Sequence, residues 1–154
     1  KDDLISRGEI LLQQVVKLPV GNILGTEVPV EIPITEEFAV IGRIDLLTEE
    51  SGKTVITDFK TAAKKPSQND VDSNMQLTTY SIAYPESEQR IRALVKSSKP
   101  SCYDFTTARS LDQQVRVRKL FSKVKDAIES GVFYPHESWV CSGCQYYKRC
   151  HKDF

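Results

Sequence analysis

Two aspartates and a lysine in the first half of the sequence have types and spacing that could do chemistry together. Asp45 ends the segment GRID within an apolar stretch, and the triplet Asp58-Phe59-Lys60 follows a short turn. Carboxylates and lysine are poor choices for the middle of a β-sheet unless they have partners or a function. These residues therefore indicate a polar site on a sheet.

The segments around these residues read as consecutive antiparallel strands, which can bring Asp45 within a few ångströms of Asp58. Alternation along a strand puts Asp58 and Lys60 on one face and Phe59 on the other. Two close carboxylates repel unless a cation lies between them, and oxygen ligands favour Mg²⁺ or Mn²⁺. A lysine there can orient water or neutralise charge developing on a phosphate. The alternative is a salt-bridged pair on a solvated sheet edge, and spacing leaves both open.

A helix expected after these strands carries Gln76 and Tyr80 four residues apart, so both side chains project from one helical face. An amide and a phenol on that face can hydrogen-bond a phosphodiester or the lysine. The alternative is a surface glutamine beside a half-buried tyrosine.

The elements that must position these side chains follow from periodicity and turn residues. Helices are expected over 2–16, 71–83 and 111–130, the last with Gly131 as C-cap, and strands over 27–33, 38–47, 54–59, 90–96 and 102–107. The first three strands should form an antiparallel meander, and residues 134–154 show no clear period. This order predicts an α/β domain with one mixed sheet.

The composition is that of a globular chain with balanced charge. Acidic and basic side chains number 21 each, so the chain has no overall excess of basic residues of the kind that many nucleic-acid binders show. No apolar run approaches the roughly 20 residues that span a membrane, and no signal peptide is visible, so a cytoplasmic, non-membrane protein is expected. The chain begins at Lys1 and its single methionine is Met75, which indicates a fragment lacking an upstream segment.

Three short motifs occur in a specific order between residues 42 and 80. They are Gly42-Arg43-Ile44-Asp45, Ile56-Thr57-Asp58-Phe59-Lys60-Thr61 and Gln76-x3-Tyr80. The combination resembles the PD-(D/E)XK nuclease superfamily, and most closely its RecB-like branch, which includes the AddB and CRISPR-associated adaptation nucleases. The resemblance implies one nuclease domain over 1–154 with a restriction-endonuclease-like core, a mixed central β-sheet flanked by helices.

The resemblance also implies roles for individual residues. Asp45 and Asp58 would be metal ligands, with the carbonyl of Phe59 as a further ligand. Lys60 would be the catalytic lysine. The residues it assigns to catalysis are Asp45, Asp58, Lys60, Gln76 and Tyr80. An additional acidic residue on the preceding strand is common in this branch, and both Glu27 and Glu31 are candidates.

The implied reaction is Mg²⁺- or Mn²⁺-dependent hydrolysis of DNA phosphodiester bonds, by an exonuclease rather than an endonuclease, in recombination or repair. DNA would be the substrate, and helicase or other recombination subunits are candidate partners. Two alternatives from other classes are a DNA-binding module that kept the fold without cutting, and a metal-ribbon interaction protein whose tail is the functional part.

Three of the four cysteines crowd into the tail, residues 139–154, as Cys141-x2-Cys144-x5-Cys150. Such crowding in an intracellular chain more often means a metal or a cluster than disulfides. Members of the RecB-like branch frequently use this pattern, with one upstream cysteine, to hold a [4Fe–4S] cluster. Here the remaining cysteine is Cys102, expected to be a structural thiol on a strand. A cluster completed from upstream, a Zn²⁺ site with His151 or Cys102 as fourth ligand, and free thiols all stay open.

The expected helix 111–130 combines an apolar stripe with many basic residues. The stripe consists of Val117, Leu120, Phe121, Val124 and Ile128. The basic residues are Arg116, Arg118, Lys119, Lys123 and Lys125. This pattern predicts a core helix with a solvated basic face. The same face could follow a DNA backbone, with contacts that weaken as salt rises.

Overall fold

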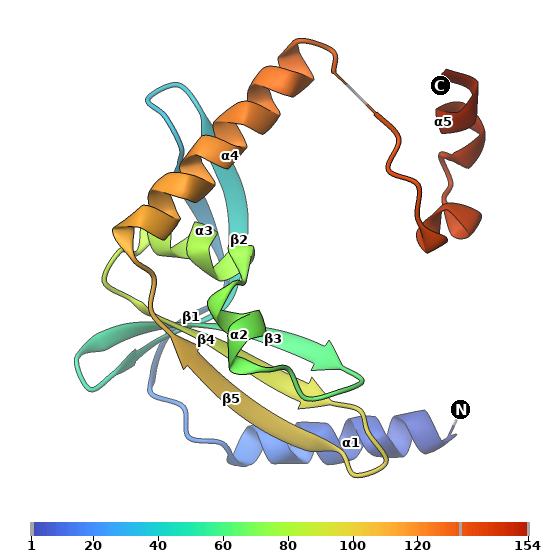
Figure 1. Cartoon of the computed structure of the whole chain (residues 1–154). Coiled ribbons are helices and arrows are strands. Elements are labelled where there is room, and N and C mark those ends of the chain that lie inside the picture. Colours follow the sequence, from blue (N-terminus) through green and yellow to red (C-terminus); the bar gives the residue numbers. More distant parts are fainter. Residues whose placement is uncertain (1, 133, 154) are drawn as a thin grey trace. The chain divides into compact units, whose positions relative to one another are not determined.

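A five-stranded mixed sheet, in the order β1-β2-β3-β4-β5, is the centre of the computed structural model, which describes residues 2–132 and 134–153 (Figure 1). The strands are β1 (Asn22–Pro33), β2 (Ala39–Glu50), β3 (Lys53–Ala62), β4 (Glu88–Val95) and β5 (Ser101–Thr107). All neighbours pair antiparallel except β3 and β4, which run parallel. The predicted meander and mixed sheet are therefore confirmed, although β1 begins earlier than expected.

The turn between β2 and β3 sets the register of the hairpin that carries Asp45 and Asp58. Ser51 and Gly52 have φ values of 53° and 76°, as the two positions of a type I′ turn require. Pairing then runs from Glu50 opposite Lys53 to Leu46 opposite Thr57. One further step along both strands reaches the two aspartates.

The helix predicted over 71–83 is wrong in one respect, because it is two helices. These are α2 (Gln68–Asp72) and α3 (Met75–Ala83). Asn74 has an extended backbone between them, and its side chain accepts a hydrogen bond from the Leu77 amide, so it caps α3. Ser67 and Asp70 form a capping box at the start of α2. Capping side chains, rather than hydrophobic periodicity, therefore decide where α3 begins.

Helices cover both faces of the sheet, with α2 and α3 on one side and α1 (Asp2–Lys17) on the other (Figure 1). Under α2 and α3 the buried cluster contains Val71, Leu77, Ile91 and Ala93, with Phe105 packed against it. On the other side Leu11 is buried, and Gln14 Nε2 donates to the Pro100 carbonyl at 3.0 Å. This α/β arrangement confirms the predicted fold class.

The long helix α4 (Leu111–Glu129) is attached through its first half. Gln114 Nε2 donates to the Ser81 carbonyl at 3.2 Å, and Arg118 donates to the carbonyls of Pro33 and Ile34. The helix ends at Glu129, and the predicted capping glycine, Gly131, follows with a φ of 66° in a Schellman motif in which the Val132 amide donates to Ala127 O.

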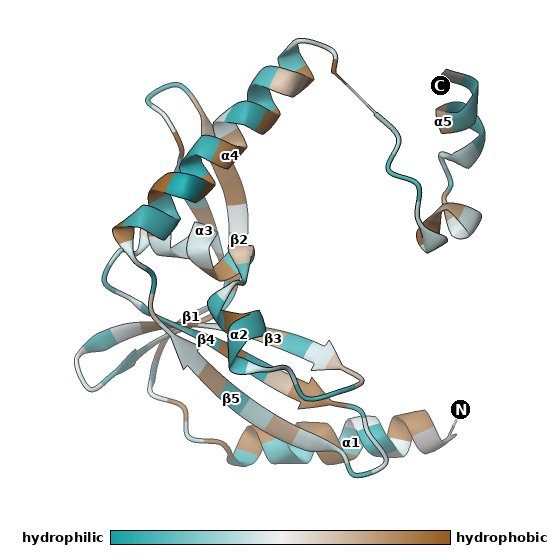
Figure 2. Ribbon diagram, in the orientation of Figure 1, coloured by the Kyte–Doolittle hydropathy of each residue, from teal (hydrophilic) through white to brown (hydrophobic). Residues whose placement is uncertain are grey.

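The prediction that the apolar stripe of α4 lies in the core is wrong for its second half. Leu120, Val124 and Ile128 are 47%, 47% and 57% exposed. Figure 2 accordingly shows brown positions distributed along this helix among hydrophilic ones.

The chain divides into two compact units, Lys1–Lys119 and Leu120–Phe154. The second unit contains η1 (Trp139–Gly143) and α5 (Tyr147–Asp153), in a region where no period was expected. Each of these helices is too short for a repeating apolar face to be recognised. No helix among the described residues has the length and apolarity needed to cross a bilayer.

Candidate active site

Backbone pairing between β2 and β3 ends just before the two aspartates, and a hydrogen bond to the Asp45 side chain follows it. Leu46 opposite Thr57 is the last backbone pair. Beyond it, Asp45 Oδ2 accepts a hydrogen bond from the Phe59 amide at 2.8 Å. A side-chain oxygen thus satisfies a backbone donor that would otherwise lack a strand partner. The Asp45 side chain therefore reaches the residue that follows Asp58 on β3.

Lys60 joins β3 to α3. Its Nζ lies 2.8 Å from Asp58 Oδ2 and donates to Gln76 Oε1 at 2.8 Å. The Asp58 side chain is 3% exposed, whereas that of Lys60 is 43% exposed. The Lys60 side chain is therefore held by two polar partners and remains partly exposed to solvent.

The contacts continue from Gln76 to the β2 backbone. Gln76 Nε2 donates to Tyr80 Oη at 3.0 Å, and the Tyr80 hydroxyl donates to the Arg43 carbonyl. A Cβ atom added at Gly42 would lie 3.1 Å from Tyr80 Cε1, so glycine is what lets the ring approach the strand. The sequence motif thus corresponds to one chain of contacts from β3 through α3 to β2.

The carboxyl group of Asp58 has a pKa raised above its ordinary range. Burial is the main cause, and the negative charge of Asp45 acts in the same direction, whereas Lys60 opposes both through its hydrogen bond and its charge. Ionised Asp58 therefore has incomplete charge compensation among the described side chains.

The two carboxylates suit a hard divalent cation. Apart from its ion pair with Lys60, buried Asp58 Oδ2 has no hydrogen bond of good geometry within the described part of the chain. An oxygen in this state, beside a second carboxylate, matches the ligand preference of Mg²⁺ and Mn²⁺. Among the described residues, no set of three or more His, Cys, Asp or Glu side chains is arranged around a common point.

The two glutamates on β1 lie at different levels of the sheet. Thr26 pairs with Leu46 and Val28 with Ile44, which leaves Glu27 at the level of Asp45. Its backbone has an unusual φ of 51°, and its carboxylate is 4.0 Å from Arg43 Nε. Glu31 pairs with Ile41 farther along and is exposed. Register therefore favours Glu27 as the acidic residue nearer the site.

Comparison with known proteins assigns the family. The sequence model of the PD-(D/E)XK nuclease superfamily matches residues 8–151. The chain belongs to this superfamily. No curated protein sequence matches it.

Two solved structures share the fold of this PD-(D/E)XK domain at low sequence identity. The crystal structure of SSO0001 is 16% identical with a TM-score of 0.51, and the match covers 95% of this chain and 67% of that one. A "Putative exonuclease" from Eubacterium rectale is 13% identical with a TM-score of 0.56, and the match covers 96% of this chain and 58% of that one. The chain thus spans only part of the length of these two proteins.

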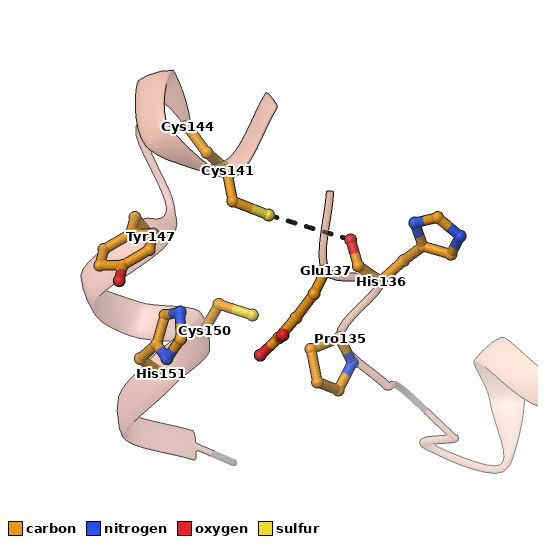
Figure 3. Close-up of a pocket in the computed structure, with 8 residues that line it drawn as sticks. All are labelled: Pro135, His136, Glu137, Cys141, Cys144, Tyr147, Cys150 and His151. Carbon is orange, nitrogen blue, oxygen red and sulfur yellow. Dashed lines mark hydrogen bonds between the residues drawn. The ribbon is translucent and has the colours of Figure 1, made fainter. Parts of the chain in front are cut away.

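The cysteines of this PD-(D/E)XK chain lie in both units. Cys141, Cys144 and Cys150 line one cavity of about 140 Å³ in the second unit, together with His151. Figure 3 shows the side chains of Cys150 and Glu137 pointing toward one another across it, while the Cys141 thiol faces the His136 carbonyl at 3.9 Å. The three thiols share this cavity without forming a set arranged to hold a metal. Cys102 lies half-buried on β5, and burial raises the pKa of its thiol.

A charged pair that was not predicted lies on the face of the sheet opposite Asp58 and Lys60 in this PD-(D/E)XK domain. Arg92, on β4, is 1% exposed and paired with Asp104 on β5. The available signal was an arginine between Ile91 and Ala93, in the interior of an apolar strand, where a charge needs a partner.

Proposed function

We propose that the chain is the nuclease core of a RecB-like deoxyribonuclease that hydrolyses DNA phosphodiester bonds with Mg²⁺ or Mn²⁺. Within this proposal residues 1–154 act as one nuclease domain, as an exonuclease in cytoplasmic recombination or repair, alongside helicase or other recombination subunits. The observation that supports the proposal most is the continuous set of contacts from Asp58 through Lys60 and Gln76 to Tyr80.

Each side chain has a task that follows from its position. Asp45 and Asp58 would hold the metal, with the carbonyl of Phe59 as a further ligand. When bound, the metal supplies Lewis acidity at a phosphate oxygen and a water of lowered pKa. Lys60 directs its exposed positive charge toward the scissile phosphate, where negative charge develops during attack.

Two residues of α3 keep the lysine in that position. Gln76 accepts from the ammonium group, which fixes the side chain while leaving its outer face free. The Tyr80 hydroxyl accepts a hydrogen bond from Gln76 and donates one to the Arg43 carbonyl, which fixes the position of α3 relative to β2. Positioning of this kind contributes to catalysis because the charge is in place before the reaction begins.

Cleavage of end-labelled linear DNA, single- and double-stranded, tests the proposal. We expect cutting with Mn²⁺ that EDTA abolishes, and Asp45→Asn protein should lose it by at least about 100-fold because one carboxylate ligand is gone. Glu49→Gln, on the same strand, is the matched control and should cut as wild type does. DNA binding without cutting would favour the binding-module alternative, and equal cutting by Asp45→Asn protein would remove Asp45 from the mechanism.

We also propose that Cys141, Cys144 and Cys150 bind metal, as a [4Fe–4S] cluster completed by a ligand from outside these three or as Zn²⁺ with His151. Their shared cavity supports this proposal.

Metal analysis of anaerobically purified protein separates these two forms of the proposal. Iron and acid-labile sulfide in equal amounts indicate the cluster, whereas zinc without sulfide indicates the zinc site. Cys144→Ser protein should lose most of the metal, because a serine hydroxyl is a poor ligand for either. Wild-type protein without iron or zinc would contradict the proposal.

A further inference from the structure

A row of three side chains, with the buried Arg92 at its centre, crosses β3, β4 and β5 at the level of the candidate site. Phe59 is in register with Arg92, and Arg92 is in register with Asp104. Because side chains alternate along a strand, this row lies on the face of the sheet opposite Asp58 and Lys60. It therefore lies beneath the proposed metal ligands.

The contacts within this row are close and directional. Arg92 donates from Nε to Asp104 Oδ1 and from Nη2 to Asp104 Oδ2, both at 2.8 Å. Its guanidinium carbon lies 5.9 Å from the centroid of the Phe59 ring. The Arg92 side chain is 2% exposed. The two hydrogen bonds to Asp104 thus orient the guanidinium group, which lies over the Phe59 ring.

Stability alone is a weak reason to bury Arg92. Desolvation of its guanidinium offsets much of its attraction to Asp104, whose side chain is 30% exposed, and an apolar residue of similar volume often serves as well. Arg92 does, however, lie over the ring of Phe59, the residue whose amide binds Asp45. Phe59 follows Asp58 directly, and its amide donates to Asp45 Oδ2 at 2.8 Å.

We propose that Arg92 and Asp104 are positioning residues that hold Phe59 so that its amide keeps Asp45 in place for metal binding. The inference rests on the proposed metal site at Asp45, Asp58 and Phe59. It assigns the Arg92–Asp104 pair an effect on the site through the strand, without contact to metal or DNA.

Arg90 provides a matched control two residues away on the same strand and face. It also makes a bidentate pair, with Glu50 at 2.9 and 2.7 Å, but its register partner on β3 is Thr57 rather than Phe59. Lysine keeps the positive charge but loses the planar fork. Arg92→Lys and Arg90→Lys therefore remove similar pairs, and we expect both to lower the melting temperature.

Two measurements on metal-free and metal-titrated protein distinguish positioning from a general loss of stability. In metal-free protein, amide exchange at Phe59 followed by NMR should be about tenfold faster in Arg92→Lys than in Arg90→Lys. Calorimetric titration without DNA should show Mn²⁺ binding about 10-fold weaker in Arg92→Lys, the lower end of the effect of outer partners on metal sites, and unchanged in Arg90→Lys. Equal exchange and equal affinity in the two variants would overturn the inference.

The same experiments separate this inference from the proposed function. Wild-type protein that binds no Mn²⁺ would contradict the metal site. The difference in Phe59 amide exchange between Arg92→Lys and Arg90→Lys would then test by itself whether Arg92 holds Phe59 in place. If Arg92→Lys protein does not fold, Phe59→Leu replaces it, because leucine keeps the backbone amide and removes the ring on which the guanidinium lies. Exchange at position 59 as slow as in wild type would then overturn the inference.

Discussion

Lys60→Ala protein is expected to lose DNA cleavage by about 10²–10⁴-fold while keeping its fold and its affinity for DNA within a few fold. Loss of a positioned charge or proton donor in the transition state typically has effects of this size. The fold should remain because the Lys60 side chain is 43% exposed and its two contacts are with polar atoms. Single-turnover cleavage at saturating Mn²⁺ measures the effect on the chemical step.

Lys53→Ala is the matched control for this experiment. Lys53 is the first residue of the same strand and is exposed, so its loss removes one positive charge far along β3 from the site. It should cut at the wild-type rate. If Lys60→Ala protein cuts as fast as Lys53→Ala protein, the assignment of Lys60 is wrong. Equal losses in both would indicate a general contribution of charge to DNA binding.

Asp58→Asn is expected to change activity and stability in opposite directions. Cleavage and Mn²⁺ affinity should fall steeply, because a buried carboxylate ligand becomes a neutral amide. In EDTA the same variant should be more stable than wild type, by about 0.5–2 kcal/mol, the size of effect seen when a destabilised functional residue is replaced. Urea unfolding in EDTA and calorimetry with Mn²⁺ measure the two effects.

The pH dependence of this stability difference follows from the raised pKa of Asp58. In the folded protein the carboxyl keeps its proton to a higher pH than in the unfolded chain, where aspartate titrates near ~3.9. The stability that protonated Asp58 contributes is therefore present below the unfolded pKa and lost as pH rises through the folded pKa. Wild type should approach Asp58→Asn at acid pH and fall below it at neutral pH. A difference that is the same at both pH values would contradict this explanation.

Several structural features could be predicted from local patterns because their causes are local. The Ser51-Gly52 turn fixes the β2–β3 register through its backbone conformation, and that register brings Asp45 and Asp58 to the same end of the hairpin. Gln76 and Tyr80 share a face because they are one helical turn apart, and the structure joins them at 3.0 Å. The break before α3 was missed, because the Asn74 cap outweighs the hydrophobic pattern there.

By itself, the sequence predicted the order of the main elements, the antiparallel pairing of the first three strands and a set of candidate site residues, since each depends on spacing within one or two elements. The tertiary structure alone decided which distant residues support them. Gly42 lies close to the Tyr80 ring, and Lys60 donates a hydrogen bond to Gln76. Arg92 lies over the Phe59 ring and donates hydrogen bonds to Asp104. These contacts join strands and helices far apart in the chain, and their partners depend on sheet order and helix placement, which no local period encodes.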